Sequence, residues 1–186
     1  MGRRTEVTPG GLASVRAVRS LRGPIPSSES DLARTPGLAV ALGMGGQVAW
    51  RSLVPAFSPD LPAAPEARVR AGTADLVVHR SGGSLVLEGF ARRIDPRTSG
   101  AEARTFVGGT VALGAFVMPR RLEMVGRASG WEAPGGASVL RRTTRELGAN
   151  VHLDGHQAKV QTGLREVTGG DLPTLQTLVV QLQVLF

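Results

Sequence analysis

The sequence contains no cysteine and no tyrosine, and Lys159 is its only lysine. Without cysteine there is no disulfide scaffold and no thiolate metal site, although the cellular compartment stays open. No stretch approaches the roughly 18 apolar residues of a transmembrane helix, so any membrane contact has to come from strands or from a surface helix. A chain of 186 residues is expected to form one domain.

The net charge of +7 comes almost entirely from arginine. Such a balance can indicate nucleic-acid binding. Here the arginines are scattered along the chain, and aromatic residues make up only 4% of it, which leaves little to stack bases on. We therefore expect no nucleic-acid partner, and a coding bias toward high GC content explains arginine in place of lysine.

Apolar residues alternate with polar or small ones in eight stretches, and this period of two predicts amphipathic strands. The clearest stretch is TLQTLVVQLQVLF at the C-terminus. One of its faces carries Leu178, Val180, Leu182, Val184 and Phe186, whereas the other carries Thr177, Gln181 and Gln183. The other seven stretches are residues 38–50, 68–80, 85–93, 104–117, 121–131, 143–153 and 156–167. The pattern predicts an all-β fold, with about eight strands in residues 37–186 of a single segment 1–186.

Residues 1–36 have the least defined pattern. Residues 3–8 resemble the end of a strand, and residues 12–22 (LASVRAVRSLR) fit either a short amphipathic helix or another strand. The turn-rich stretch GPIPSSESDLARTPG follows. The first residues carry no apolar run after their basic side chains and so do not form a secretory signal. For an exported protein we therefore expect this chain to be truncated at its N-terminus.

The connections between the predicted strands alternate in length. Tight turns are expected at 81–84, 118–120 and 154–155, and longer loops at 51–67, 94–103, 132–142 and 168–173. Outer-membrane barrels combine short periplasmic turns with longer outer loops, and a soluble β-sandwich has no reason to do so. The sequence therefore predicts an antiparallel transmembrane β-barrel, with its apolar face toward lipid and its polar face toward a wet lumen.

Charged residues on the polar faces are the candidates for a pore lining. They are Arg51, Arg92, Arg121, Arg127, Lys159, Arg165, Glu88, Glu123 and Glu146. Asn150, His152 and Gln161 share these faces. Cationic side chains in a pore favour the passage of anions, whereas carboxylates on the same wall pair with them and reduce the effect.

Two blocks near the C-terminus, RELGANVHLDGHQAKVQTGLREV and LQTLVVQLQVLF, carry a family resemblance. They are similar to the last hairpin and the closing strand of the phosphate-selective porin family (O and P type) of Gram-negative outer membranes. The matching positions are Gly148, Asn150, Asp154, Gly155, His156, Lys159, Val160, Gln161, Leu182, Gln183 and Phe186. Weaker similarity covers residues 28–43 and 117–129.

The resemblance implies a barrel of 16 strands that assembles as a homotrimer, of which this chain would be the C-terminal half. It implies a passive channel in the outer membrane for small anionic solutes such as phosphate, with no enzymatic chemistry and no cofactor. The apolar face that ends at Phe186 resembles the signal that the barrel-assembly machinery recognises.

Two other functions fit the alternating pattern. A small closed barrel of eight strands would have a structural or adhesion role. A soluble all-β binding protein, such as a lipocalin-like barrel, would need an apolar interior. The chain carries no recognisable catalytic set, and its histidines, His79, His152 and His156, are too far apart in the sequence to predict a metal site.

Overall fold

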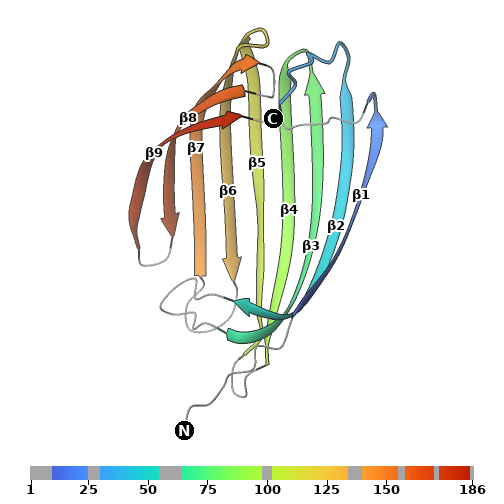
Figure 1. Cartoon of the computed structure of the whole chain (residues 1–186), viewed down its shortest axis with the longest axis vertical. Coiled ribbons are helices and arrows are strands. Elements are labelled where there is room, and N and C mark those ends of the chain that lie inside the picture. The colour runs from blue at the N-terminus through green and yellow to red at the C-terminus, as the bar shows by residue number, and fades with distance from the viewer. Residues whose placement is uncertain are drawn as a thin grey trace.

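Nine antiparallel strands form one sheet in sequence order (Figure 1). The computed structural model describes residues 10–24, 30–54, 64–97, 102–133, 140–154, 158–169 and 172–184. The strands are β1 (Gly11–Arg22), β2 (Ala39–Val54), β3 (Ala64–Arg80), β4 (Gly83–Pro96), β5 (Arg104–Met118), β6 (Leu122–Ala133), β7 (Leu140–Asp154), β8 (Ala158–Gly169) and β9 (Leu172–Val184). The predicted all-β antiparallel fold is confirmed. In the described residues β1 and β9 do not pair with each other, so the sheet has two open edges.

All eight predicted strands are present, and residues 12–22 form the ninth strand rather than a helix. The stretch 51–67, which contains four prolines, was predicted to be a loop, and this is wrong at both of its ends. Ser52 pairs with Ala67 and Val54 pairs with Ala64 in an irregular register. The register shifts accommodate the interruptions that the sequence shows, so that β2 and β3 extend into the predicted loop. In the described residues no helix is long and apolar enough to cross a membrane.

The tight turns after β3, β5 and β7 lie together at one end of the sheet, and the connections after β2, β4, β6 and β8 lie at the other. The longer loop predicted at 168–173 is wrong, because β8 extends to Gly169 and β9 begins at Leu172. Ser81 and Gly82 have φ angles of 54° and 93°, and Arg80 pairs with Gly83 across them. Two positive φ angles in a two-residue hairpin define a type I′ turn, which explains the glycine. Residues 119–121 form the next turn, whereas residues 155–157 of the third lie outside the described chain. The connection from β1 to β2 also lies at this tight-turn end.

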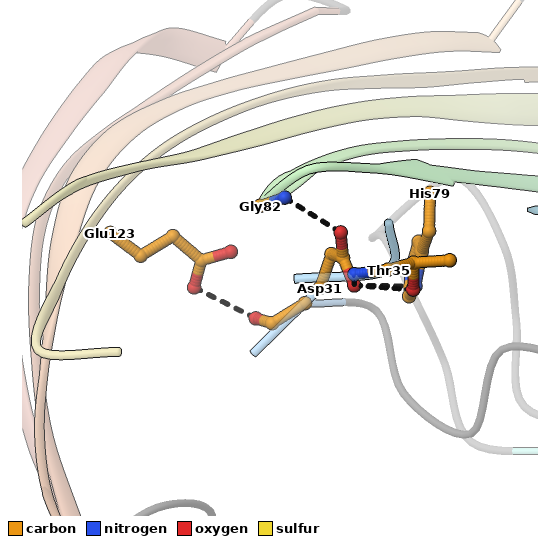
Figure 2. Close-up of polar contacts among 6 residues, drawn as sticks. Asp31, Thr35, His79, Gly82 and Glu123 are labelled. Atoms are coloured by element: carbon orange, nitrogen blue, oxygen red, sulfur yellow. Dashed lines mark hydrogen bonds and ion pairs between the residues drawn. The ribbon is translucent and has the colours of Figure 1, made fainter. Parts of the chain in front are cut away.

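The strand register divides the side chains between two faces of the sheet. Asp75, Glu88 and Thr110 are paired across β3, β4 and β5 and therefore lie on one face of the sheet. We call this face the inner face. The neighbouring row Leu76, Leu87 and Val111 lies on the opposite, outer face. Figure 2 shows the sheet curving around the side chains of the inner face.

The outer face is apolar and exposed. Leu147 is 73% exposed, Leu178 is 69% exposed and Leu164 is 66% exposed. In contrast, the buried apolar side chains of the described residues are small or few, and the cluster Ala67, Val69 and Ile94 is their only compact group. This cluster lies on the inner face near the ends of β3 and β4. In the side chains that the structure describes, the sheet therefore has no large apolar core of the kind that a soluble domain buries.

Candidate functional site

A segment of the β1–β2 connection folds over the inner face. This inner segment, residues 30–37, begins with a turn in which the Arg34 amide donates to the Asp31 carbonyl over 3.0 Å. Aspartate is favoured at the first position of such a turn, and Arg34 takes a positive φ angle of 52° to complete it. Figure 2 shows Asp31 and Thr35 within the curve of the sheet.

Asp31 anchors the inner segment to the β3–β4 turn. Asp31 is only 1% exposed. Its carboxylate accepts hydrogen bonds from the Gly82 amide (2.7 Å), the Thr35 amide (2.9 Å) and the Thr35 hydroxyl (2.7 Å) (Figure 2). A reciprocal bond runs from the Ser81 amide to the Thr35 carbonyl (2.8 Å). Both hairpin residues thus bind the segment.

The hydrogen bonds keep Asp31 ionised. Burial is the largest single influence and by itself raises the pKa, but the amides of Thr35 and Gly82 and the Thr35 hydroxyl together outweigh it, so the pKa of Asp31 is lowered. His79 contributes less, because its Nδ1 lies 3.8 Å from Asp31 Oδ1, beyond hydrogen-bond distance. The histidine attracts the carboxylate only when it is protonated.

Glu123 forms the second anchor, on β6. This carboxylate is 1% exposed, and its Oε2 accepts from the Ser30 hydroxyl over 2.7 Å and from the Asn150 amide group over 2.9 Å. Gln161 donates to Asn150 Oδ1 over 3.1 Å, and His152 Nε2 lies 3.6 Å from Glu123 Oε2. The inner segment is therefore joined to a polar network that crosses β6, β7 and β8.

Gly114 makes room for this carboxylate. A Cβ atom at Gly114 would lie 2.6 Å from Glu123 Oε1 and 2.6 Å from the Ser84 hydroxyl. A side chain on β5 at this position would displace Glu123 from the bonds to Ser30 and Asn150. The glycine is thus part of the anchor.

The structure places most of the predicted pore-lining residues on one face. By register the inner face carries Glu88, Arg92, Glu123, Arg127, Glu146, Lys159 and Arg165. Arg165 and Glu146 form the expected ion pair. Arg121 lies in the turn before β6, and Arg51 lies in β2 with its side chain outside the described part of the structure.

A hollow of about 470 Å³ is lined by residues of β4 to β9 and by Ser30 of the inner segment. Its lining includes Ser30, Glu123, Arg127, Glu146, Lys159 and Arg165. Cations and carboxylates therefore share one wall of the hollow, and Glu123 is held by neutral hydrogen-bond donors, Ser30 and Asn150. Such a wall can attract a small anion without a strong site for it.

The predicted assembly signal lies on the outer face of β9. Its residues Leu178, Val180, Leu182 and Val184 are between 47% and 69% exposed, and Phe186 lies outside the described residues. Their role in assembly stays a prediction.

Sequence reasoning missed the inner segment. Ser30, Asp31 and Thr35 lie in the stretch whose pattern was least defined, and the only local signal was a turn-forming Asp followed by Thr four residues later. It also assigned no carboxylate partner to the histidines, whereas His79 lies beside Asp31 and His152 lies beside Glu123. In the described ranges no group of three or more histidine, aspartate or glutamate residues could hold a metal ion.

Comparison with known proteins yields no matching family model, no matching curated protein and no matching solved structure.

Proposed function

We propose that this chain is part of the wall of an outer-membrane porin, a passive channel for small anionic solutes such as phosphate. The observation that carries the proposal is the distribution of side chains on the sheet. Large apolar residues are exposed on the outer face, and Asp75, Glu123, Asn150 and His152 are buried on the inner one. Lipid around the sheet and water within it would match both faces.

The outer face is too apolar to be left in water. Exposed apolar patches beyond a few hundred Å² mark surfaces that are covered in the cell. Here leucine, valine and methionine side chains are exposed on every strand from β5 to β9, among them Leu113, Met124 and Leu182. A continuous apolar surface of this kind fits the hydrocarbon of a bilayer.

The direction of the strands supports a larger barrel. In a nine-stranded antiparallel sheet β1 and β9 run in the same direction, so a direct seam between them would be parallel. Transmembrane barrels are antiparallel throughout. An odd number of further strands would cover both edges, and seven would complete the 16 that the resemblance implies. The same parity disfavours a small closed barrel made of these strands alone.

The inner segment would narrow the channel at the tight-turn end. It crosses the inner face from the β3–β4 turn to β6, and the cationic groups Arg127 and Lys159 line the hollow beside it. The carboxylate of Glu146 is paired with Arg165 and so offsets its charge. We propose a wide wet path with a modest preference for anions. The trimer and the recognition of β9 by the barrel-assembly machinery are proposed on the resemblance alone.

Conductance of the complete gene product in a planar bilayer tests the proposal. A salt gradient gives the reversal potential and hence the preference for anions. Glu146→Gln leaves Arg165 unpaired, so the reversal potential should shift toward that of the anion. Glu166→Gln removes the same charge from the outer face and should leave the potential unchanged. A protein that inserts without conducting, or an equal shift in both variants, contradicts the channel.

A soluble all-β binding protein is the competing class. It would bury apolar side chains on the inner face and expose polar ones outside, which is the reverse of the arrangement of Glu123 and Leu147. Fractionation decides between them. Recovery of the complete product from the detergent-free soluble fraction, as a monodisperse species, would exclude the barrel.

A further inference from the structure

A band of charged residues borders the apolar part of the outer face at the end opposite the tight turns. Its arginines are Arg68, Arg70, Arg93, Arg141 and Arg145. Its carboxylates are Asp95, Glu132 and Glu166. The register places all eight on the outer face of β3, β4, β6, β7 and β8, where Arg68 pairs with Asp95, Arg141 with Glu132 and Arg145 with Glu166. We call these residues the outer band.

The outer band carries more positive than negative charge. Asp95 accepts from both Arg70 (2.9 Å) and Arg93 (2.7 Å), and Arg145 lies 4.0 Å from Glu166. Arg68 and Arg141 are exposed, and neither has an ion-pair partner among the described residues. Five arginines against three carboxylates leave a formal surplus of two positive charges.

The opposite end of the outer face differs. From β5 to β9 it stays apolar up to the tight turns, and the last outward side chains include Val117 (58% exposed), Leu153 (65%) and Val184 (47%). On β3 the change to charge comes at Arg70, on β4 at Arg93, on β7 at Arg145 and on β8 at Glu166. The apolar surface of β3, β4, β6, β7 and β8 therefore has a charged border on the long-loop side, which β5 interrupts with Thr105 and Val107.

We propose that the outer band binds the phosphate headgroups of anionic lipids in the leaflet on the long-loop side. This inference rests on the proposed function, which places the outer face in a bilayer. A guanidinium group binds phosphate oxygens through two parallel hydrogen bonds, and Arg68 and Arg141 have these donors available. Arginines at the level of the headgroups each add roughly 1 kcal/mol of attraction to an anionic surface, which corresponds to about a fivefold preference.

Trp50 provides a reporter next to the outer band. It is 47% exposed and lies two residues after Val48, which pairs with Arg70 on the same face. Trp131 packs edge-on against Phe106 on the inner face, so Trp131→Phe keeps a ring there and leaves Trp50 as the only tryptophan of these 186 residues. The complete product with this change, and with any tryptophan outside these residues also replaced by phenylalanine, is reconstituted in phosphatidylcholine vesicles that contain either brominated phosphatidylcholine or brominated phosphatidylglycerol. Quenching of Trp50 then reports which lipid lies against the outer band.

Two double variants form a matched pair. Arg68→Gln with Arg141→Gln removes two charges from the outer band. Arg104→Gln with Arg142→Gln removes two charges from the same end of the inner face, where Arg104 pairs with Ile94 and Arg142 with Trp131. We expect phosphatidylglycerol to quench Trp50 several-fold more effectively in the parent, this preference to fall toward one in the first variant, and the second variant to retain it. Circular dichroism checks that all variants keep the sheet.

The outcomes separate the two proposals. No quenching by either brominated lipid means that Trp50 does not face lipid, and this overturns the outer-band inference, whereas the proposed function fails only if the same product does not conduct in a planar bilayer. Equal quenching by both lipids overturns the inference alone. A preference that survives Arg68→Gln with Arg141→Gln, or that falls equally in the inner-face variant, also overturns it. High salt should reduce a true preference by screening.

Discussion

The two faces of this sheet are built on the same strands yet contrast in every property that a solvent selects. Val180 and Gln181 are neighbours in β9, and one is outward and apolar while the other is inward and polar. Glu123 is 1% exposed, whereas Met124 beside it is 48% exposed. In this sheet polar side chains are buried and large apolar side chains are exposed, which is the reverse of the arrangement in a soluble domain. Four predictions test it.

The largest effect is expected from a charge on the outer face. Val180→Arg should lower the stability of the folded protein in lipid vesicles by about 2–4 kcal/mol, because the guanidinium group would enter the hydrocarbon. Gln181→Arg adds the same group one residue away on the inner face and should cost little. Urea titration of the complete product refolded into vesicles, without assembly machinery, measures both. If Val180→Arg is harmless or improves solubility while Gln181→Arg is damaging, the faces have been assigned the wrong way round.

The second prediction concerns the anchor of the inner segment. Asp31→Ala leaves the Gly82 and Thr35 amides without their acceptor, and a buried donor left in this way costs about 1–3 kcal/mol. The inner segment should detach, and trypsin should cut after Arg34 much faster than in the parent. Ser30→Ala removes the bond to Glu123 and leaves the three bonds that Asp31 accepts in place, so it should accelerate the cut less. Equal cutting of parent and Asp31→Ala would show that Asp31 does not hold the segment.

Acid should detach the same segment. The folded pKa of Asp31 is lowered, so the docking energy is fully present above its ordinary value, near 3.8, and is lost as the pH falls through the lowered value. Trypsin is inactive at that pH, so hydrogen exchange of the Gly82 amide is the measurement. Asp31→Asn should remove the pH dependence. Protection that changes with pH in the Asn variant as in the parent would assign the titration to another group.

The smallest effect is expected at the β3–β4 turn. Gly82→Ala should destabilise the sheet by roughly 1 kcal/mol, because its φ angle of 93° is unfavourable for a residue with a side chain. Gly89→Ala on the outer face of β4 has open space for the methyl group and an ordinary φ angle. The Gly89→Ala variant should be as stable as the parent or slightly more stable. A larger loss at Gly89 than at Gly82 would contradict the type I′ turn.

Much of the fold could be predicted from the sequence because strand alternation is local. Leu178 to Val184 and the pair Ser81 and Gly82 contain their own structural signals, namely a period of two and a turn that needs positive φ angles. The C-terminal end of β2 at Val54 could not be predicted, because pairing with β3 across an irregular register extends the strand although prolines follow it in the sequence. Likewise residues 12–22 fitted helix and strand equally, and pairing with β2 decided the matter.

The candidate site was predictable only in part. Alternation alone assigns Lys159 and Arg165 to the polar face of β8. The contact of Asp31 with Gly82, in contrast, depends on the position of a connection in space, which no local pattern contains. For the same reason His79 and His152 could not be matched to their carboxylates from sequence distance.

The anchors of the inner segment also have a consequence for the order of folding. Each strand pairs with the next one in the chain, so the sheet can grow by short loop closures. The bond from Gly82 to Asp31 spans 51 residues, and the bond from Ser30 to Glu123 spans 93. Closing such distances is slow unless the intervening strands have already brought the ends together. We expect the inner segment to dock last, so that protection of Arg34 from trypsin would time the completion of β3 to β6.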